Sequence, residues 1–180
     1  QKLSLKSEYM CYNIFNFNFI KSKFGMVKLK LDKKIVKGLG KNIAIRTKKY
    51  NEFRREFNLS KSVSTYDELN KMVKEKYSDI LVGSDQLWLP VNVVADYYTL
   101  NWVPEDVNKI SYATSFGVSL IPKKYNDLYK KFLSRIDHLS IREDSGVKLA
   151  KYVANVDGKL VCDPTILLTK EEWEEVAIKD

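Results

Sequence analysis

The stretch LVGSDQLW, residues 81–88, begins as an apolar run and turns polar after Gly83. Read from two residues earlier, the run is DILVG, a short continuous apolar segment typical of a strand buried on both faces. Glycine permits a tight turn and the close approach of a ligand to the backbone, so the polar residues that follow are placed where they can contact a ligand. The alternative is a helix cap, with Ser84 or Asp85 as the N-cap residue.

The strand pattern recurs three times downstream, and helix patterns precede the first strand, separate the last three strands and follow the fourth. The predicted strands are DILVG at 79–83, NKISYATSFG at 108–117, HLSIRE at 138–143 and KLVCDP at 159–164. The predicted helices cover residues 64–77, 123–136, 143–154 and 169–177. This alternation predicts an α/β fold, a Rossmann-like, mostly parallel sheet flanked by helices, over residues 61–180.

Two of these helices carry capping signals. Thr65 and Glu68 have the spacing of a capping box, and Leu69 and later apolar residues form one helix face. Thr169 is placed to cap the last helix. Along residues 123–136, the aromatic and aliphatic side chains fall on one side, as expected for a helix that packs on a sheet.

The first 60 residues differ from the rest in charge, with 15 Lys and Arg against four Asp and Glu, where residues 61–180 have 16 against 19. We expect residues 1–60 to form a basic, aromatic-rich part of the same domain, with peripheral helices. Helical spacing of Tyr50, Phe53 and Phe57 predicts a helix over residues 47–57. The Lys-apolar alternation around residues 26–31 fits either a strand or a basic helix face.

A basic segment can meet nucleic acid, anionic lipid or an anionic glycan, or it can be a solvated lysine-rich surface. The sequence has no RGG run and no zinc-finger spacing, so we expect no nucleic-acid partner. Peripheral contact with a membrane through the basic residues 21–49 is the expected alternative. No stretch approaches the roughly 20 apolar residues of a membrane span, and no signal peptide opens the sequence, so we expect a cytoplasmic protein.

Cysteine and histidine are too sparse for several familiar kinds of site. Cys11 and Cys162 lie far apart and outside any CxxC motif, and Cys162 within an apolar run is expected to be a small core residue. His138 is the single histidine, and no GxSxG motif accompanies it. A zinc site and a Ser-His-Asp triad are therefore not indicated, and His138 is interpreted as structural.

In parallel sheets, ligands bind outside the carboxyl ends of the strands. The segments that follow the predicted strands are Gly83–Trp88, Ser115–Gly117, Arg142–Glu143 and Asp163–Pro164. We expect them to meet at one rim of the sheet. At that rim Arg142 either grips a carboxylate or phosphate with two parallel bonds or forms a salt bridge to Glu143, Asp144 or Asp85.

The remaining rim residues have equally open roles. Ser115 and the Gly117 backbone either hold phosphate or sugar oxygens or permit close helix-to-sheet packing. Trp88 is interpreted as packing rather than sugar stacking. Asp163 and Pro164 are interpreted as a turn that ends the fourth strand.

Five blocks of the sequence together resemble the polysaccharide pyruvyl transferase family. They are DILVGSDQLW, YYTLNWV, KISYATSFG, HLSIREDSGVKLA and VCDPTILLTKEEW, in that family's order, from about Asp79 to Trp173. The resemblance implies a two-domain architecture like GT-B glycosyltransferases, of which this chain is part of the N-terminal half. The family's usual opening strand and Asn-Tyr-Gly-type loop are not found before Gln1, and its C-terminal half is not found after Asp180.

The resemblance implies transfer of the enolpyruvyl carbons of phosphoenolpyruvate to a sugar of a capsular, exopolysaccharide or cell-wall glycan, as a pyruvate ketal. The partners would be phosphoenolpyruvate and a sugar or lipid-linked glycan, without a metal or organic cofactor. The residues assigned to catalysis are Asp85 and Glu143, and those assigned to substrate binding are Gly83, Ser84, Gln86, Ser115, Gly117 and Arg142.

Two other functions remain open on the same architecture. One is nucleotide-sugar glycosyl transfer, and the other is a non-catalytic module for glycan binding or assembly. A location at the inner face of the membrane would suit a lipid-linked acceptor. Without the second half, the chain by itself is expected to be inactive.

Overall fold

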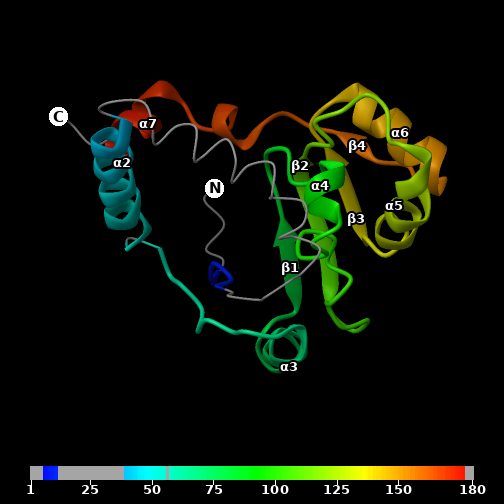
Figure 1. The fold of residues 1–180 in the computed structure, drawn as a ribbon, viewed down its shortest axis with the longest axis horizontal. Helices are drawn as coiled ribbons and strands as arrows, with labels where there is room; N and C mark the ends of the chain where they lie inside the picture. The colour runs from blue at the N-terminus through cyan, green and yellow to red at the C-terminus, as the bar shows by residue number, and fades with distance from the viewer. Residues whose placement is uncertain (1–5, 12–38, 56, 177–180) are drawn as a thin grey trace. The chain divides into compact units, whose positions relative to one another are not determined.

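The computed structural model describes residues 6–11, 39–55 and 57–176, which fall into two compact units, one up to Leu69 and one from Asn70 onward (Figure 1). The described helices are α2 (Leu39–Arg54), α3 (Tyr66–Lys76), α4 (Pro90–Val93), η1 (Lys123–Tyr125), α5 (Asn126–Leu133), α6 (Asp144–Ala154), η2 (Pro164–Ile166) and α7 (Lys170–Val176). The strands are β1 (Asp79–Val82), β2 (Asn108–Thr114), β3 (His138–Ile141) and β4 (Lys159–Leu160). The assignment of residues 1–60 and 61–180 to one domain stays a prediction.

The first unit contains the helix predicted from its aromatic spacing. α2 begins at Leu39, well before the expected start, and ends at Arg54. Phe57 lies past the helix, yet its ring centroid is 4.9 Å from that of Phe53 and 4.7 Å from that of Tyr9. The element expected around residues 26–31 lies outside the described residues.

The predicted capping box at the start of α3 is confirmed. The Glu68 amide donates to Thr65 Oγ1 at 3.1 Å, and the Ser64 amide donates to Glu68 Oε2 at 2.9 Å. Leu69 and Val73 are fully buried, which confirms the expected apolar face. The first bond satisfies a backbone donor that the first helical turn leaves without a partner, and the second ties the residue before the cap to the helix.

The second unit is built on a four-stranded sheet in the order β1-β2-β3-β4, with every neighbouring pair parallel. The predicted Rossmann-like α/β fold is thereby confirmed. Each strand is added beside the previous one without a reversal of direction. Because crossover connections are right-handed, such an order places the connecting helices on one face of the sheet. Figure 1 shows α5 and α6 together on one side of the strands.

The core lies between that face of the sheet and those two helices. β1 contributes Ile80 and Val82, β2 contributes Ala113, and β3 contributes Leu139 and Ile141, all buried. The buried residues of the helices are Tyr129, Phe132 and Leu133 of α5 and Leu149 and Ala150 of α6. The positions in α5 follow the helical spacing expected from the sequence.

The expectation that β1 is buried on both faces is wrong. Ile80 and Val82 are buried, but the Leu81 side chain between them is 65% exposed. The reason is the strand order, since the helices that connect the strands cover only the face on which Ile80 and Val82 lie. A continuous apolar run therefore does not by itself report how many faces of a strand are covered.

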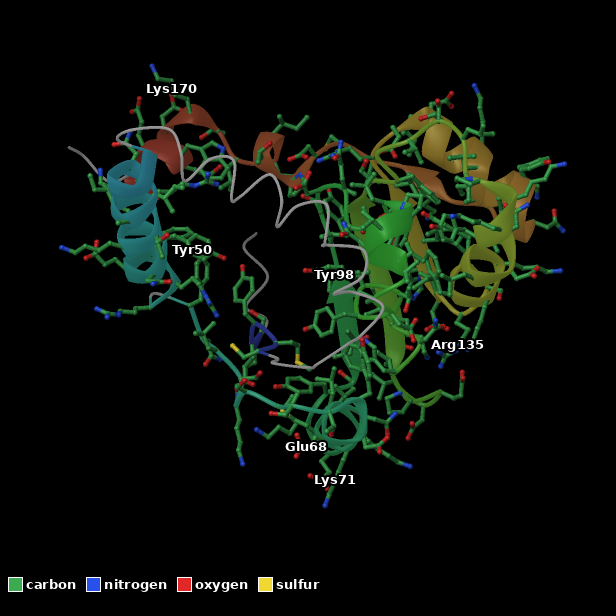
Figure 2. All side chains as sticks on the ribbon, in the orientation of Figure 1. Tyr50, Glu68, Lys71, Tyr98, Arg135 and Lys170 are labelled. Carbon is green, nitrogen blue, oxygen red and sulfur yellow. The ribbon has the colours of Figure 1, made fainter. Side chains whose placement is uncertain are left out.

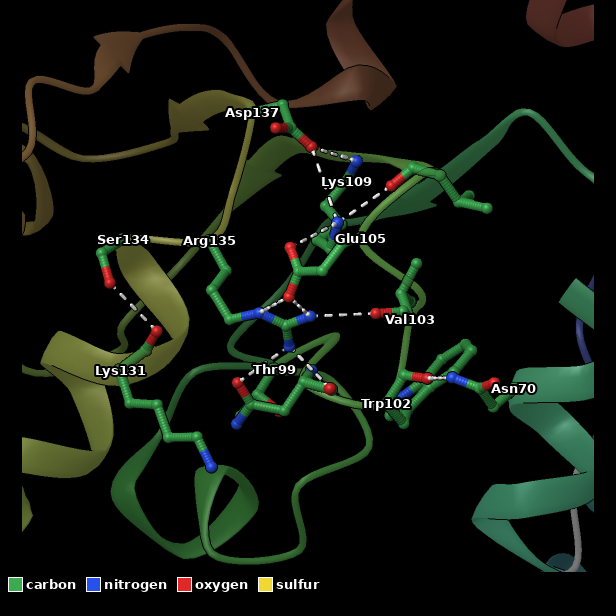
Figure 3. Close-up of polar contacts among 12 residues, drawn as sticks. Asn70, Thr99, Trp102, Val103, Glu105, Lys109, Lys131, Ser134, Arg135 and Asp137 are labelled. Carbon is green, nitrogen blue, oxygen red and sulfur yellow. Dashed lines mark hydrogen bonds and ion pairs between the residues drawn. The ribbon is translucent and has the colours of Figure 1, made fainter. Parts of the chain in front are cut away.

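The amino ends of the strands are held by a network of ion pairs and hydrogen bonds around Lys109, whose side chain is only 2% exposed (Figure 3). Lys109 Nζ donates to the Val107 carbonyl at 2.9 Å and lies 4.0 Å from carboxylate oxygens of Glu105 and Asp137. Charged residues are rarely fully buried unless they are paired, so the two carboxylates account for this lysine.

Arg135 extends the same network to the loop before β2. Its Nη1 donates to the Asn101 carbonyl at 2.6 Å, and its Nη2 donates to the Val103 carbonyl at 3.0 Å (Figure 3). Nη2 also lies 2.8 Å from Glu105 Oε1. The N–H donors of this one guanidinium thus hold three positions of the loop, at Asn101, Val103 and Glu105.

Candidate functional site

The carboxyl end of β1 lies closely against β2. A Cβ atom at Gly83 would stand 2.1 Å from the Tyr112 carbonyl oxygen, so no side chain fits there. Opposite it, Ala113 has a φ of +51°, and the pairing of β2 with β3 shifts between Ser111 and Thr114. This β-bulge re-aims the end of β2, and the absence of a side chain at Gly83 lets the two chains approach.

Residues 84–88 form turns, and no helix follows them directly. The alternative prediction that Ser84 or Asp85 caps a helix is wrong, because the next helix, α4, begins at Pro90 with Leu89 as its N-cap residue. The turns are instead tied to the extension of β2. The Ser115 amide donates to the Asp85 carbonyl at 2.9 Å. The Asp85 side chain is left 85% exposed.

Trp88 anchors this loop in the core, which confirms its predicted packing role. The side chain is fully buried, with ring centroids 5.4 Å from Phe116 and 5.3 Å from Phe132. The Tyr129 hydroxyl donates to the Trp88 carbonyl at 2.5 Å, and Trp88 Nε1 donates to the Tyr98 carbonyl at 3.0 Å. Burial raises the pKa of the Tyr129 hydroxyl, so it remains a donor.

Gln86 and Gly117 lie against each other. A Cβ at Gly117, whose φ is +63°, would stand 3.0 Å from the Gln86 side chain and 3.0 Å from that of Leu89. The Gln86 carbonyl accepts a bond from Asn92 Nδ2 at 3.0 Å, so its backbone is fixed while its side chain is exposed. Asn92 is a supporting residue that sequence reasoning missed, because its partner lies across a turn.

Glu143 joins the end of β3 to the extension of β2. Its Oε1 accepts bonds from Ser115 Oγ at 3.1 Å and from the Phe116 amide at 2.7 Å. Ser115 Oγ in turn accepts a bond from the Gly117 amide at 3.0 Å. Ser115 and Phe116 are both buried. One oxygen of Glu143 and the Ser115 hydroxyl are therefore occupied inside the protein.

Arg142 follows β3 and meets two carboxylates. Its Nη1 donates to Asp163 Oδ2 at 2.7 Å, while its Nη2 lies 3.7 Å from Asp85 Oδ1. Arg142 and Asp163 side chains are each 27% exposed. The contact with Asp163 is a short, partly buried ion pair. The contact with Asp85 is longer and involves an exposed side chain. The predicted salt bridge to Asp85 is present, and the stronger partner Asp163 was missed.

Asp163 has the capping role expected of it as well. Its Oδ1 accepts bonds from the Thr165 amide at 2.9 Å and from the Thr165 hydroxyl at 2.7 Å. These bonds, together with the bond from Arg142, lower the pKa of Asp163 to about 2. The carboxylate is thus ionised at all ordinary pH values, and the hydrogen bond that Arg142 donates to Asp163 raises the pKa of Arg142.

Cys162 is exposed and free, so its expected place in the core is wrong. The reason is that β4 has only two residues and lies at the edge of the sheet, so the chain has already left it at Cys162. Its Sγ lies 3.9 Å from the Tyr112 hydroxyl. Two effects chiefly raise the pKa of the Tyr112 hydroxyl. The larger is its partial burial, and the smaller is its hydrogen bond with Cys162.

The four segments that follow the strands do meet at one rim. Asp85 reaches Arg142, the Asp85 carbonyl reaches Ser115, Ser115 reaches Glu143, and Arg142 reaches Asp163. Gly83 and Ser84 lie at the start of the same loop. His138 lies at the other end of β3, on an exposed position. Which of these residues touch a substrate stays a prediction.

The rim combines one guanidinium with three carboxylates, the exposed side-chain amide of Gln86 and the hydroxyl of half-buried Ser84. Carboxylates accept hydrogen bonds from hydroxyl-bearing ligands, side-chain amides both accept and donate them, and a guanidinium binds carboxylate or phosphate. Among residues 6–11, 39–55 and 57–176, no group of three His, Cys, Asp or Glu side chains is arranged to hold a metal ion. The described part of the chain also contains no helix with the length and apolarity needed to cross a bilayer.

Fold and rim together define a Rossmann-like α/β domain with a polar site at the carboxyl ends of a parallel sheet. The model of one protein family, polysaccharide pyruvyl transferase, matches residues 10–180. The chain belongs to this family, which is a family of transferases. No curated protein and no solved structure matches the chain.

Proposed function

We propose that the chain forms the N-terminal half of an enzyme that transfers the enolpyruvyl group of phosphoenolpyruvate to a glycan sugar as a pyruvate ketal. The proposal rests on family membership and on one observation at the rim. Arg142 is held by Asp163 at 2.7 Å, with exposed Asp85 only 3.7 Å from its second terminal nitrogen. A fixed cation beside an exposed carboxylate suits a reaction that needs both anion binding and proton transfer.

Arg142 is proposed to bind the carboxylate of phosphoenolpyruvate. Its bond to Asp163 fixes the guanidinium, and the longer contact to Asp85 is the one that an incoming anion can replace. Asp85 is free to move because its side chain is 85% exposed. A planar guanidinium binds a carboxylate through two parallel bonds, which a lysine ammonium does not reproduce.

Asp85 is proposed as the acid or base of the reaction, with Ser84 and Gln86 orienting a sugar hydroxyl. Glu143 is the other carboxylate assigned to catalysis from the sequence, but one of its oxygens accepts two internal hydrogen bonds. We therefore propose that Glu143 positions Ser115 and Phe116 rather than transferring protons. Gly83 and Gly117 shape the backbone around the site through the close contacts described above.

The overall reaction converts phosphoenolpyruvate and a sugar diol into the ketal and inorganic phosphate. The methylene carbon takes up a proton while the first sugar hydroxyl bonds to the neighbouring carbon. The bond from that carbon to the phosphate oxygen then breaks, and the second hydroxyl replaces it. Of the two hydroxyl protons released, one balances the proton gained by the methyl group and one balances the phosphate.

The rim does not supply enough positive charge for the phosphate of the donor. Arg142 stands among Asp85, Glu143 and Asp163, so the local charge is negative overall. The phosphate site is therefore proposed to lie on a second, GT-B-like half that faces this rim. Such a division would give the phosphate of the donor to the second half and would leave its carboxylate and the sugar hydroxyls at this rim.

The test uses the protein as its gene encodes it, with phosphoenolpyruvate and a panel of lipid-linked and nitrophenyl sugars. Phosphate release and the mass of the pyruvylated sugar are measured for the wild type and for Arg142→Lys. We expect product from the wild type and a loss of at least about 100-fold in kcat/KM for the variant, from removal of a bidentate contact to an ion. Arg135→Lys, at the opposite end of β3, is the matched control and is expected to retain kcat/KM.

Equal activity of the two arginine variants would remove Arg142 from the site and leave the reaction in place. Absence of product with every sugar would contradict pyruvyl transfer. If a nucleotide sugar replaces phosphoenolpyruvate as the donor and a sugar product forms, the reaction is glycosyl transfer. Glycan binding without turnover would establish a binding module.

A further inference from the structure

In the helix α2 and the following Arg55, the side chains described are those of residues 42–55, and all of them are exposed. Helices of globular domains normally bury an apolar stripe. An isolated helix of this length is marginally stable in water, so most helices depend on packing. Within the described residues, this helix shows no buried stripe, and it presents its side chains to the surroundings.

Basic side chains dominate this exposed helix. The five basic residues over this range are Arg46, Lys48, Lys49, Arg54 and Arg55. The single carboxylate is Glu52, which lies 3.9 Å from Lys48 Nζ, with both side chains more than half exposed. A helix with this imbalance attracts an extended negative surface.

Large apolar side chains stand on the same helix, in line with Arg46. Ile43, Tyr50 and Phe53 follow one another at helical spacing on one face and are 51%, 59% and 43% exposed. Tyr50 extends away from the α2 ribbon in Figure 2. The Arg54 guanidinium carbon lies 6.0 Å from the centroid of the Tyr50 ring, at the end of this face.

We propose that α2 and Arg55 dock the protein on an anionic lipid bilayer. The basic residues would face the lipid headgroups, and Ile43, Tyr50 and Phe53 would enter the boundary between headgroups and acyl chains. Apolar area entering the interface and attraction to anionic lipid both contribute to binding at a membrane surface, and long basic side chains keep their charged ends at the headgroups. A nucleic acid would use the same charges but would gain nothing from the exposed aliphatic Ile43. The inference does not depend on the proposed pyruvyl transfer.

Binding to vesicles is measured by co-sedimentation of the full chain with phosphatidylcholine alone and with phosphatidylcholine containing phosphatidylserine. Two variants are compared, Arg46→Gln with Lys49→Gln in α2, and Lys71→Gln with Lys74→Gln in α3. Both pairs have the same spacing, lie on exposed helix positions and remove the same charge. Glutamine is a good helix former, so helicity is kept, and circular dichroism verifies this.

A basic residue near an anionic surface contributes about fivefold to binding, which corresponds to about 1 kcal/mol. We expect the double variant in α2 to bind the phosphatidylserine vesicles about 25-fold more weakly than the wild type. The double variant in α3 is expected to change the affinity by less than about threefold. Ile43→Ala is expected to weaken binding as well, by several-fold, because apolar area entering the interface is lost.

Three results would overturn the proposal. Equal losses with the α2 and α3 pairs would mean that net charge alone attracts the protein to the vesicles. Equal binding to neutral and anionic vesicles would exclude recognition of negative lipid. The third result is that the full chain binds a DNA duplex more tightly than it binds vesicles, that the duplex displaces it fully from the vesicles, and that Ile43→Ala leaves both affinities unchanged. This result would assign the surface to nucleic acid.

Discussion

Replacing Glu143 by alanine deprives two buried donors, the Ser115 hydroxyl and the Phe116 amide, of their acceptor. Hydrogen bonds to an ionised acceptor each contribute about 1.5–3 kcal/mol, and the half-buried position of Glu143 favours the lower end. We therefore expect the free energy of unfolding to fall by about 3 kcal/mol. In Glu143→Gln the side-chain carbonyl still accepts both bonds, and the expected loss is about 1 kcal/mol.

The assay is urea denaturation followed by tryptophan fluorescence. Trp88, Trp102 and Trp173 are the three tryptophans of the chain and all belong to the second unit, so the signal reports the unit that contains Glu143. Asp144→Asn is the control, because its side chain is 65% exposed and its ion pair with Lys148 is an exposed contact. Its expected effect is within about 0.5 kcal/mol.

The comparison of Glu143→Ala with Glu143→Gln tests whether the stabilisation comes from the hydrogen bonds that Glu143 accepts. Equal destabilisation by alanine and glutamine, or a loss under about 1 kcal/mol with alanine, would refute the positioning role of Glu143. In the activity assay Glu143→Gln should retain kcat within about tenfold, because the geometry of the rim is kept. A loss of about 100-fold or more would identify Glu143 as an acid or base instead.

Gly83→Ala is expected to destabilise the second unit by about 3 kcal/mol in the same denaturation assay, because its Cβ would overlap a β2 carbonyl oxygen, and a neutral result would refute the contact. Tyr129→Phe should cost about 1–2 kcal/mol through the unsatisfied Trp88 carbonyl, and an unchanged urea midpoint would contradict it. Asp163 has a folded-state pKa of about 2, below its unfolded value, so its stabilisation should be complete above about pH 4 and lost as the pH falls toward 2. Asp163→Asn should remove this part of the acid transition, which urea midpoints across that pH range measure.

The strands and helices of the second unit could be predicted because local patterns specify them. Each strand is an apolar run that ends at glycine, proline or a charged residue, and α3 begins at a capping box visible in the sequence. The exposure of Leu81 could not be predicted, because it depends on the order in which the strands join the sheet. Cys162 was misplaced for a related reason, namely the short length of β4.

The meeting of the strand-end segments could also be predicted, since parallel strands bring their carboxyl ends to one edge. The individual partners could not be. The bond from Arg142 to Asp163 depends on the register of β3 and β4, which pairs Ile141 with Leu160. The two bonds accepted by Glu143 depend on the β-bulge at Ala113, for which the sequence carries no distinct signal.

The way in which the loop of residues 84–88 is anchored has a consequence for evolutionary divergence within the family. Its fixed points are backbone groups and the buried Trp88, whereas the side chains of Asp85 and Gln86 are exposed. Exposed substitutions usually change stability by less than about 0.5 kcal/mol. Descendants of this sequence can therefore exchange these two side chains while the inherited scaffold stays intact.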